Sequence, residues 1–130
     1  RFEFSASHRL HAPSLSDDEN RRVFGKCNNP AGHGHNYWLE PEVEVALGEG
    51  DEPSFTLDDL ERIAEDSVIE RLDHKHLNTD VPEFRGLNPS VEHIARVCFE
   101  WLAPAIEAAG ARLRHVTVWE TEKTSCRYPV

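Results

Sequence analysis

Two alternating segments, residues 2–10 and 36–47, constrain the fold of this chain most strongly. Each has apolar side chains at every second position, which is typical of a strand with one buried face. In the first segment the apolar face includes Phe4 and also His8, so we expect this histidine to point toward the core. Pro41 lies in the second segment and indicates an edge position or a bulge.

Two amphipathic helices are expected after the second strand. Apolar residues recur at helical spacing over 57–72, and Thr56 precedes them as a plausible N-cap. A second helix is expected to begin near Asn88-Pro89-Ser90, and Pro104 is expected to perturb its end.

The remaining pattern completes an α+β fold. Residues 112–121 predict a strand, and a short final strand is expected to include Cys126. Residues 13–34 read as a long loop and residues 73–87 as an irregular stretch. We therefore expect one domain, 1–130, with a largely antiparallel sheet and two helices. So few strands leave open edges, and a sheet of this kind often closes by oligomerising.

Composition excludes several functional classes. Acidic residues number 24 against 14 basic ones, a formal charge of -10, which argues against a general nucleic-acid binder. No stretch approaches the roughly 20 apolar residues that a membrane span needs. The three cysteines, Cys27, Cys98 and Cys126, form neither a disulfide ladder nor a C-x-x-C pair, so a reducing compartment, the cytoplasm, is predicted.

The triplet His33-Gly34-His35 is the strongest indication of a metal site. Side chains two apart in a strand share a face, and Gly34 removes bulk between the two rings. If the two strands pair, His8 joins them, and three imidazoles with an open fourth position describe catalytic zinc. The alternative, that these are ordinary surface or core histidines, stays open on the spacing alone.

Cys27 lies six residues before His33 in a polar loop, next to Lys26. A neighbouring cation favours the thiolate, so Cys27 is a candidate nucleophile or general base. The alternative, a small buried hydrophobic residue, fits Cys98 and Cys126 better.

Three acidic or imidazole side chains elsewhere are weaker candidates. Glu120 is expected on an apolar strand face, where it needs either a donor-rich ligand or solvent at the strand end. Asp73 directly precedes His74 and could orient it, although adjacent side chains rarely hydrogen-bond in regular structure.

These residues lie in segments that resemble the 6-pyruvoyltetrahydropterin synthase family, which includes the 6-carboxytetrahydropterin synthases of the queuosine pathway. The likeness runs over nearly the whole chain, and the C-x5-H-x-H segment with its flanks is highly specific. The segments that carry it are Phe4-Ser-Ala-Ser-His8-Arg-Leu10, Phe24-Gly-Lys-Cys27-Asn-Asn-Pro-Ala-Gly-His33-Gly-His35-Asn-Tyr37, Leu72-Asp-His74-Lys-His-Leu-Asn78 and Trp119-Glu120-Thr121.

The resemblance implies a tunnelling fold, in which trimers close their sheets into a barrel and two trimers stack as a homohexamer. It implies active sites between subunits and 7,8-dihydroneopterin triphosphate as the substrate. The implied residue roles are zinc binding by His8, His33 and His35, proton abstraction by Cys27 with Asp73 and His74 assisting, and pterin anchoring by Glu120.

The sequence points both ways on the product. The segment Asn88-Pro89-Ser90-Val91-Glu92 replaces the consecutive threonines of the animal enzymes. Ser90 can supply one substrate-binding hydroxyl, and Val91 cannot supply the other. The Asn-Pro start resembles the queuosine branch, whereas the long C-x5-H-x-H loop resembles the pyruvoyl branch. We expect 6-carboxytetrahydropterin as the product, with 6-pyruvoyltetrahydropterin as the alternative.

A triphosphate substrate meets an acidic chain, so a local basic patch is expected. Its candidates are Arg9, Arg22, Lys26 and Lys75. Two other functions remain as alternatives: a zinc hydrolase that gives Cys27 no role, and a non-catalytic domain in which a fourth ligand closes the zinc site.

Overall fold

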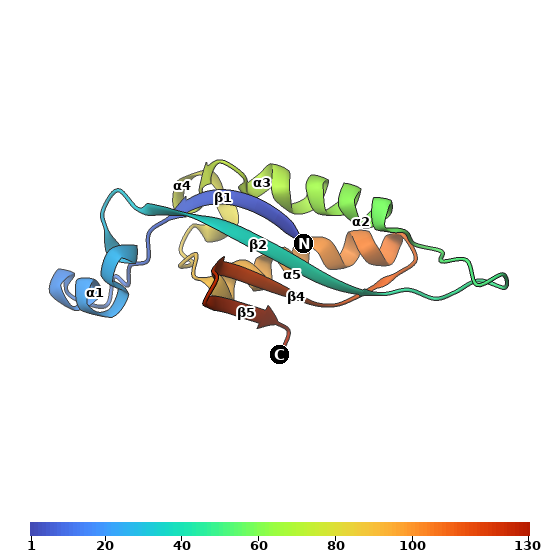
Figure 1. Ribbon diagram of the computed structural model, residues 1–130. Helices are drawn as coiled ribbons and strands as arrows, with labels where there is room; N and C mark the ends of the chain where they lie inside the picture. The colour runs from blue at the N-terminus through green and yellow to red at the C-terminus, as the bar shows by residue number, and fades with distance from the viewer.

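Five strands form one sheet in the order β3-β1-β2-β4-β5, in a computed structural model that describes residues 1–130 (Figure 1). Neighbouring strands are antiparallel except for the short parallel pair β1–β3. The α+β class and the largely antiparallel sheet are thus confirmed. The strands are β1 (Phe2–His8), β2 (His33–Glu44), β3 (Lys75–His76), β4 (Arg112–Thr121) and β5 (Thr124–Tyr128).

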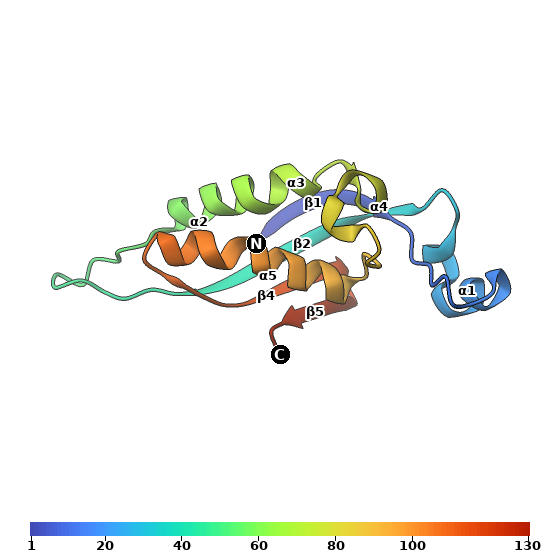
Figure 2. The same ribbon diagram turned by 180° about the vertical axis from the view of Figure 1, so that it is seen from behind.

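Two helical rods lie on the same face of this sheet (Figure 2). One is continuous from α2 (Leu57–Ala64) through a π-helical turn, η2 (Glu65–Ile69), to α3 (Glu70–Leu72). The other is α5 (Val91–Ala108), which continues through Pro104 instead of being disturbed there. Both expected helices are therefore present.

The two segments that were expected to be irregular, 13–34 and 73–87, contain short helices. Residues 13–34 include α1 (Asp17–Phe24) and a 3-10 turn, η1 (Gly25–Asn28), and α1 projects at one end of the molecule (Figure 1). A capping box between Ser16 and Glu19 begins α1, which satisfies the free N–H groups of its first turn. Residues 73–87 contain β3, α4 (Leu77–Asp80) and η3 (Pro82–Phe84).

The core lies between the sheet and the two rods. Phe4 of β1 and Tyr37 of β2 stack with ring centroids 5.0 Å apart, and Val116 and Val118 of β4 are fully buried on the same face. The expected irregularity near Pro41 is a register shift between β2 and β4 at residues 42–43.

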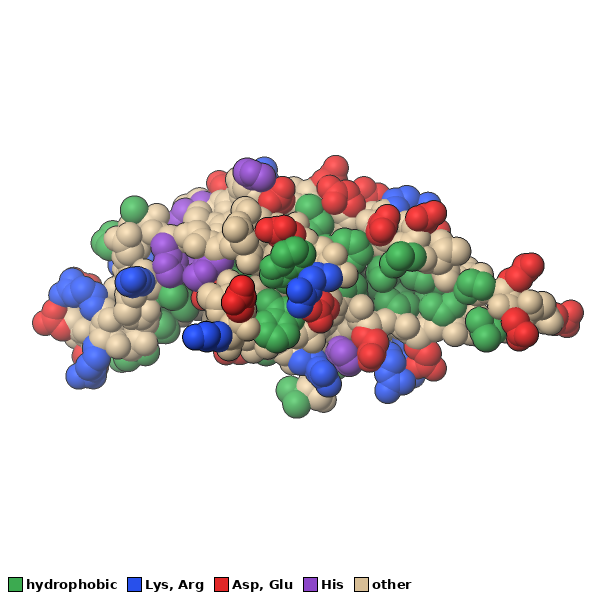
Figure 3. Space-filling view, in the orientation of Figure 1, with side chains coloured by type: hydrophobic (Ala, Val, Ile, Leu, Met, Phe, Trp, Pro, Cys, Tyr) green, Lys and Arg blue, Asp and Glu red, His purple; other side chains and the backbone are tan.

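The opposite face of the sheet has no helix over it. Figure 3 views this face and shows apolar side chains interspersed with charged ones. β3 and β5 end the sheet on either side, so both of its edges are open within one chain. No helix in the structure has the length and apolar character needed to cross a membrane.

Candidate active site

The pairing of β1 with β2 brings the three predicted metal ligands together. His8 lies directly opposite His33, and His35 lies opposite Ala6, two pairs further along. Residues two apart in a strand share a face, so all three rings lie on the core side. Their centroids are 5.2 Å apart for His8 and His33, 5.0 Å for His8 and His35, and 4.5 Å for His33 and His35.

His8 is fixed by the turn that precedes α5. Its side chain is fully buried, and Nδ1 lies 2.8 Å from the carbonyl oxygen of Pro89. A carbonyl only accepts hydrogen bonds, so Nδ1 carries the proton and Nε2 keeps a free lone pair. That Nε2 is buried and has no hydrogen-bond partner, as expected for an atom that faces a cation.

Cys27 completes the group of converging donor atoms. Its Sγ lies 3.1 Å from His33 Nε2, and His33 Nε2 lies 3.1 Å from His35 Nε2. One ligand atom from each of His8, Cys27, His33 and His35 lies within 4.8 Å of all the others. Imidazole and thiolate donors at this spacing fit a divalent metal such as zinc.

The backbone around Cys27 is tied to the end of β1. The Cys27 carbonyl accepts a 2.7 Å hydrogen bond from the Leu10 N–H. The buried side chain of Asn28 donates to the Leu10 carbonyl at 2.7 Å. These two bonds hold η1 against the strand that carries His8, and so bring the thiol to the histidines.

Gly32, and not Gly34, is the glycine that the cluster requires. Gly32 has φ +77°, and an added Cβ would lie 2.8 Å from the His8 carbonyl oxygen and 2.9 Å from His76 Nε2. A Cβ on Gly34 would meet only the Ala6 carbonyl oxygen at 3.5 Å, an ordinary contact. Crowding is therefore relieved at Gly32, and not at Gly34 as expected from the H-x-H spacing.

Glu120 reaches the cluster from β4. Its Oε1 lies 3.1 Å from His35 Nε2, and its side chain is only 13% exposed. Burial raises the pKa of this carboxyl group. Glu120 therefore lies beside the histidines and away from bulk solvent, which leaves the strand-end-in-solvent alternative unsupported.

Electrostatics keeps the imidazoles in the form that binds metals. Burial lowers the pKa of His8 and His33. Burial, together with His8 and His33 nearby, lowers the pKa of His35 to about 4. All three rings are neutral at pH 7, so their lone pairs are free for coordination. Burial, with a smaller effect from Glu120, raises the pKa of the Cys27 thiol.

Asp73 and His74 form a pair of their own. Asp73 Oδ1 accepts a 2.9 Å hydrogen bond from the Ser5 N–H, and Asp73 Oδ2 lies 2.9 Å from His74 Nδ1. The two adjacent side chains meet because His74 adopts φ +60°, outside regular structure. No hydrogen bond or ion pair links either residue to Cys27.

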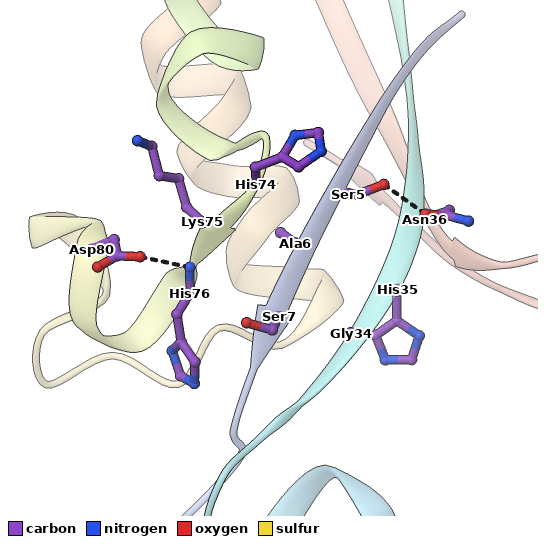
Figure 4. A pocket seen from close by; sticks show the side chains of 10 residues that line it. All are labelled: Ser5, Ala6, Ser7, Gly34, His35, Asn36, His74, Lys75, His76 and Asp80. Atoms are coloured by element: carbon purple, nitrogen blue, oxygen red, sulfur yellow. Dashed lines mark hydrogen bonds between the residues drawn. The ribbon is translucent and has the colours of Figure 1, made fainter.

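His74 instead borders a cavity of about 560 Å³ at the edge of the sheet. Figure 4 shows His74, Lys75 and His76 beside β1, with Ser5 and Ser7 on that strand and Asn36 on β2. The His74 side chain is 83% exposed, and Cys27 and Glu120 do not line this cavity.

The remaining predicted residues lie around these two groups. Ser90 caps α5, since its Oγ accepts a hydrogen bond from the His93 N–H at 3.3 Å, and it directly follows Pro89. Arg9 donates to the Asn28 carbonyl at 3.2 Å, whereas Lys75 borders the cavity beside His74. Lys and Arg side chains also gather at the α1 end, near histidine side chains (Figure 3).

Two groups that position His8 were not predicted from the sequence. The Pro89 carbonyl is a backbone group, so no residue pattern marks it. The Tyr37 hydroxyl lies 3.3 Å from His8 Nδ1, and its place at residue i+2 from His35 on the same strand face was the available signal.

Curated relatives match the chain over most of its length. Human 6-pyruvoyl tetrahydrobiopterin synthase is 38% identical over 128 residues, which cover 98% of this chain and 87% of the human protein. The Dictyostelium discoideum enzyme of the same name is 36% identical over 125 residues, 96% of this chain and 89% of that protein. The solved structure of Caenorhabditis elegans 6-pyruvoyl tetrahydropterin synthase superposes with a TM-score of 0.87 at 35% identity, covering 98% of this chain and 89% of that one.

These relatives correct the expected product. The Asn-Pro start of the turn before α5 favoured the 6-carboxytetrahydropterin branch, but the matched relatives carry the 6-pyruvoyl name. The preference for the queuosine branch was therefore wrong. The turn was a weak guide because only a few of its residues distinguish the branches, whereas the match extends over the whole chain.

The family model described as 6-pyruvoyl tetrahydropterin synthase matches residues 1–129. This range includes both strands of the histidine cluster, the turn that carries Cys27, and Glu120. The sequence match and the superposition agree on the same fold. The chain therefore belongs to the 6-pyruvoyl tetrahydropterin synthase family.

Proposed function

We propose that this protein is a metal-dependent lyase that converts 7,8-dihydroneopterin triphosphate to 6-pyruvoyltetrahydropterin with loss of triphosphate. The observation that carries the proposal is the convergence of three imidazoles, the Cys27 thiol and Glu120 at one place. The family match over residues 1–129 supports it.

His8, His33 and His35 are proposed to hold a divalent metal ion, with zinc the best fit to the donor set. When bound, the ion supplies a Lewis acid that polarises the hydroxyl groups of the substrate side chain. The three histidines contribute by fixing the position of that charge. His8 does so with the least freedom, because it is fully buried and bonded to Pro89.

Cys27 is proposed as the general base. Its thiolate removes a carbon-bound proton next to a hydroxyl group and leaves an enediol in the side chain. A proton is then added to the pterin ring as triphosphate departs. Oxidation of the side chain balances reduction of the ring, so no external redox cofactor is required. A carbon acid of this kind needs a positioned base and an electrophile at the adjacent oxygen.

Glu120 is proposed to anchor the pterin. A carboxylate with little exposure can accept hydrogen bonds from the amino and ring N–H groups of a pterin. It lies 3.1 Å from His35, so this anchor would place the substrate side chain over the histidines. Ser90, in the turn next to Pro89, is proposed to contribute one further hydroxyl contact.

Asp73 and His74 are proposed to serve Cys27 of a neighbouring copy. Within one chain His74 is exposed, and neither residue of the pair is bonded to Cys27. Both edges of the sheet are open, so copies can pair edge to edge and bring His74 of one copy to the cluster of the next. We propose a homohexamer built from two trimers, with the active sites between subunits.

The triphosphate is proposed to contact basic residues near Cys27. Lys26 lies in η1 next to Cys27, and Arg9 follows β1 and donates to the Asn28 carbonyl of η1. The exposed Lys and Arg side chains at that end would offset the acidic surface elsewhere (Figure 3). Lys75, beside the Asp73–His74 pair, would approach the same phosphates only from a neighbouring copy.

The test is a product analysis by mass spectrometry. Zinc-loaded protein is incubated with 7,8-dihydroneopterin triphosphate, and 6-pyruvoyltetrahydropterin with stoichiometric triphosphate is expected. No turnover with the metal bound, or acetaldehyde release with a 6-carboxy product, would contradict the proposal.

Cys27→Ala is the matched control for the two other readings of the metal site. Loss of activity with metal still bound is expected. A hydrolase that uses metal-activated water would keep its activity in this variant, and a purely structural site would show no pterin binding in either protein.

A further inference from the structure

Cys27 lies among the donor atoms of the histidine cluster and not merely near it. Its Sγ is 3.1 Å from His33 Nε2, the same distance that separates His33 Nε2 from His35 Nε2. A base that only approached the substrate would not need to be this close to a metal-binding nitrogen.

The spacing agrees with four-coordinate binding. With metal–nitrogen distances of about 2.0–2.1 Å and a metal–sulfur distance of about 2.3 Å, a tetrahedron separates neighbouring donors by about 3.3–3.6 Å. The donor atoms here lie between 3.1 Å and 4.8 Å from one another. Small side-chain rotations would bring every pair to the tetrahedral value. Thiolate and imidazole are both ligands that zinc accepts in a tetrahedral site.

We propose that Cys27 is an exchangeable fourth ligand: its sulfur binds the metal when no substrate is present and leaves when the hydroxyl groups of the substrate arrive. The second half of this inference rests on the proposed lyase function. Metal binding by Cys27 releases the thiol proton to solvent. Displacement then frees a thiolate beside the carbon that it must deprotonate, with no further proton transfer needed to activate it.

The local structure allows the sulfur to move while the backbone stays still. The Leu10 and Asn28 hydrogen bonds hold the backbone of η1, and the Cys27 side chain is half-buried. A change of rotamer about χ1 moves a sulfur atom by about 3 Å, enough to exchange a metal contact for a substrate contact. The histidines have less freedom, because His8 is fully buried and all three lie on paired strands.

The exchange also protects the reactive group. A metal-bound thiolate is shielded from alkylation and oxidation until it is displaced, whereas a free thiolate at the surface is not. Cys126, also half-buried, does not belong to the group of converging donor atoms, so it provides an internal reference for this protection.

The test uses the full-length chain loaded with cobalt(II) in place of zinc. A near-ultraviolet thiolate-to-cobalt charge-transfer band is expected in the wild type. The band should be lost in Cys27→Ala and retained in Cys126→Ser, with one cobalt per chain by metal analysis in each. Addition of 7,8-dihydroneopterin, which carries the hydroxyl groups without the triphosphate, should weaken the band several-fold. It should also raise the rate of Cys27 alkylation relative to Cys126, measured by peptide mass spectrometry.

A wild-type spectrum without the band, with cobalt bound, would overturn the ligand role of Cys27. A band that persists at saturating 7,8-dihydroneopterin would overturn the exchange. Both outcomes are separate from failure of the lyase proposal, which would appear as a normal band with no turnover of the triphosphate substrate by the zinc-loaded protein.

Discussion

The histidine cluster and the Asp73–His74 pair differ in how they are built. The cluster lies on the core face of paired strands, with His8 fully buried, and the spacing of its histidines follows from the register of β1 against β2. The pair lies at the sheet edge, with His74 83% exposed and bordering an open cavity. One group is complete within a single chain, and the other presents its functional side chain to the outside.

This difference agrees with the proposal that the two groups act together across an interface between copies of the chain. The donor atoms of the interior group all come from one chain: the histidines from β1 and β2, and the thiol from η1. The exposed group has an oriented imidazole with nothing in its own chain to act on. An exposed histidine held by a half-buried carboxylate can take part in proton transfer where a second protein surface covers it.

The largest expected effect comes from removing the two groups separately, each in a different copy of the chain. Cys27→Ala and His74→Ala are each expected to lower kcat by about 10²–10⁴-fold, the range for loss of a general base or its partner. If the groups meet across an interface, reassembling a 1:1 mixture of the two variants restores about a quarter of the sites, since random assembly places both intact residues together at that frequency. Activity is measured before and after denaturation and refolding of the mixture.

The control for that experiment is the mixture of Cys27→Ala with Asp73→Asn, which should behave in the same way. A chain carrying both substitutions, mixed with Cys27→Ala alone, should restore nothing. If refolded mixtures of the single variants stay inactive while forming mixed oligomers, the pair acts within its own chain and the division between copies is refuted.

The interior group was open to prediction from sequence because it depends on strand periodicity. Alternation placed His8 on the core face, and the H-x-H spacing placed His33 and His35 on one face. The pairing of two strands then brought all three together. Glu120 followed from the same reasoning on β4. These are local rules, so one sequence is sufficient.

The features that were not predicted involve groups without a side-chain signature or a proposed contact with a second chain. The Pro89 carbonyl orients His8, but backbone groups occur at every residue. The α1 helix was read as loop although Ser16 and Glu19 form a capping box, because its apolar residues are too few for a helical pattern. The proposed partner of His74 lies in a neighbouring copy, and the periodicity of one chain carries no information about it.

A smaller effect is expected from Gly32→Ala, which disturbs only the interior group. Its φ of +77° and the 2.8 Å approach of a Cβ to the His8 carbonyl oxygen predict a loss of about 2–4 kcal/mol in the free energy of unfolding. Displacement of His8 should also weaken metal binding by about 10–100-fold. Denaturant unfolding of the metal-free protein and a metal competition titration measure the two effects.

Gly34→Ala, two residues further along the chain in β2, is the matched control. Its Cβ would make only a 3.5 Å contact, so a change below about 1 kcal/mol and normal metal affinity are expected. Equal destabilisation by both substitutions would show that an added Cβ is tolerated at neither glycine. It would contradict the special role of Gly32.

The smallest effect is expected at Ser90, which caps α5 and directly follows Pro89, the residue whose carbonyl holds His8. Ser90→Ala removes the α5 cap and should lower the free energy of unfolding by about 1 kcal/mol. It should also raise KM if the hydroxyl hydrogen, which the cap does not use, donates to the substrate. Ser90→Asp separates these effects, because a carboxylate caps a helix well but donates no hydrogen bond. Normal stability with a raised KM in Ser90→Asp would support substrate contact. A KM that returns to the wild-type value together with stability would assign Ser90 to the helix alone, leaving the Pro89 carbonyl and His8 as the only connection between this turn and the chemistry.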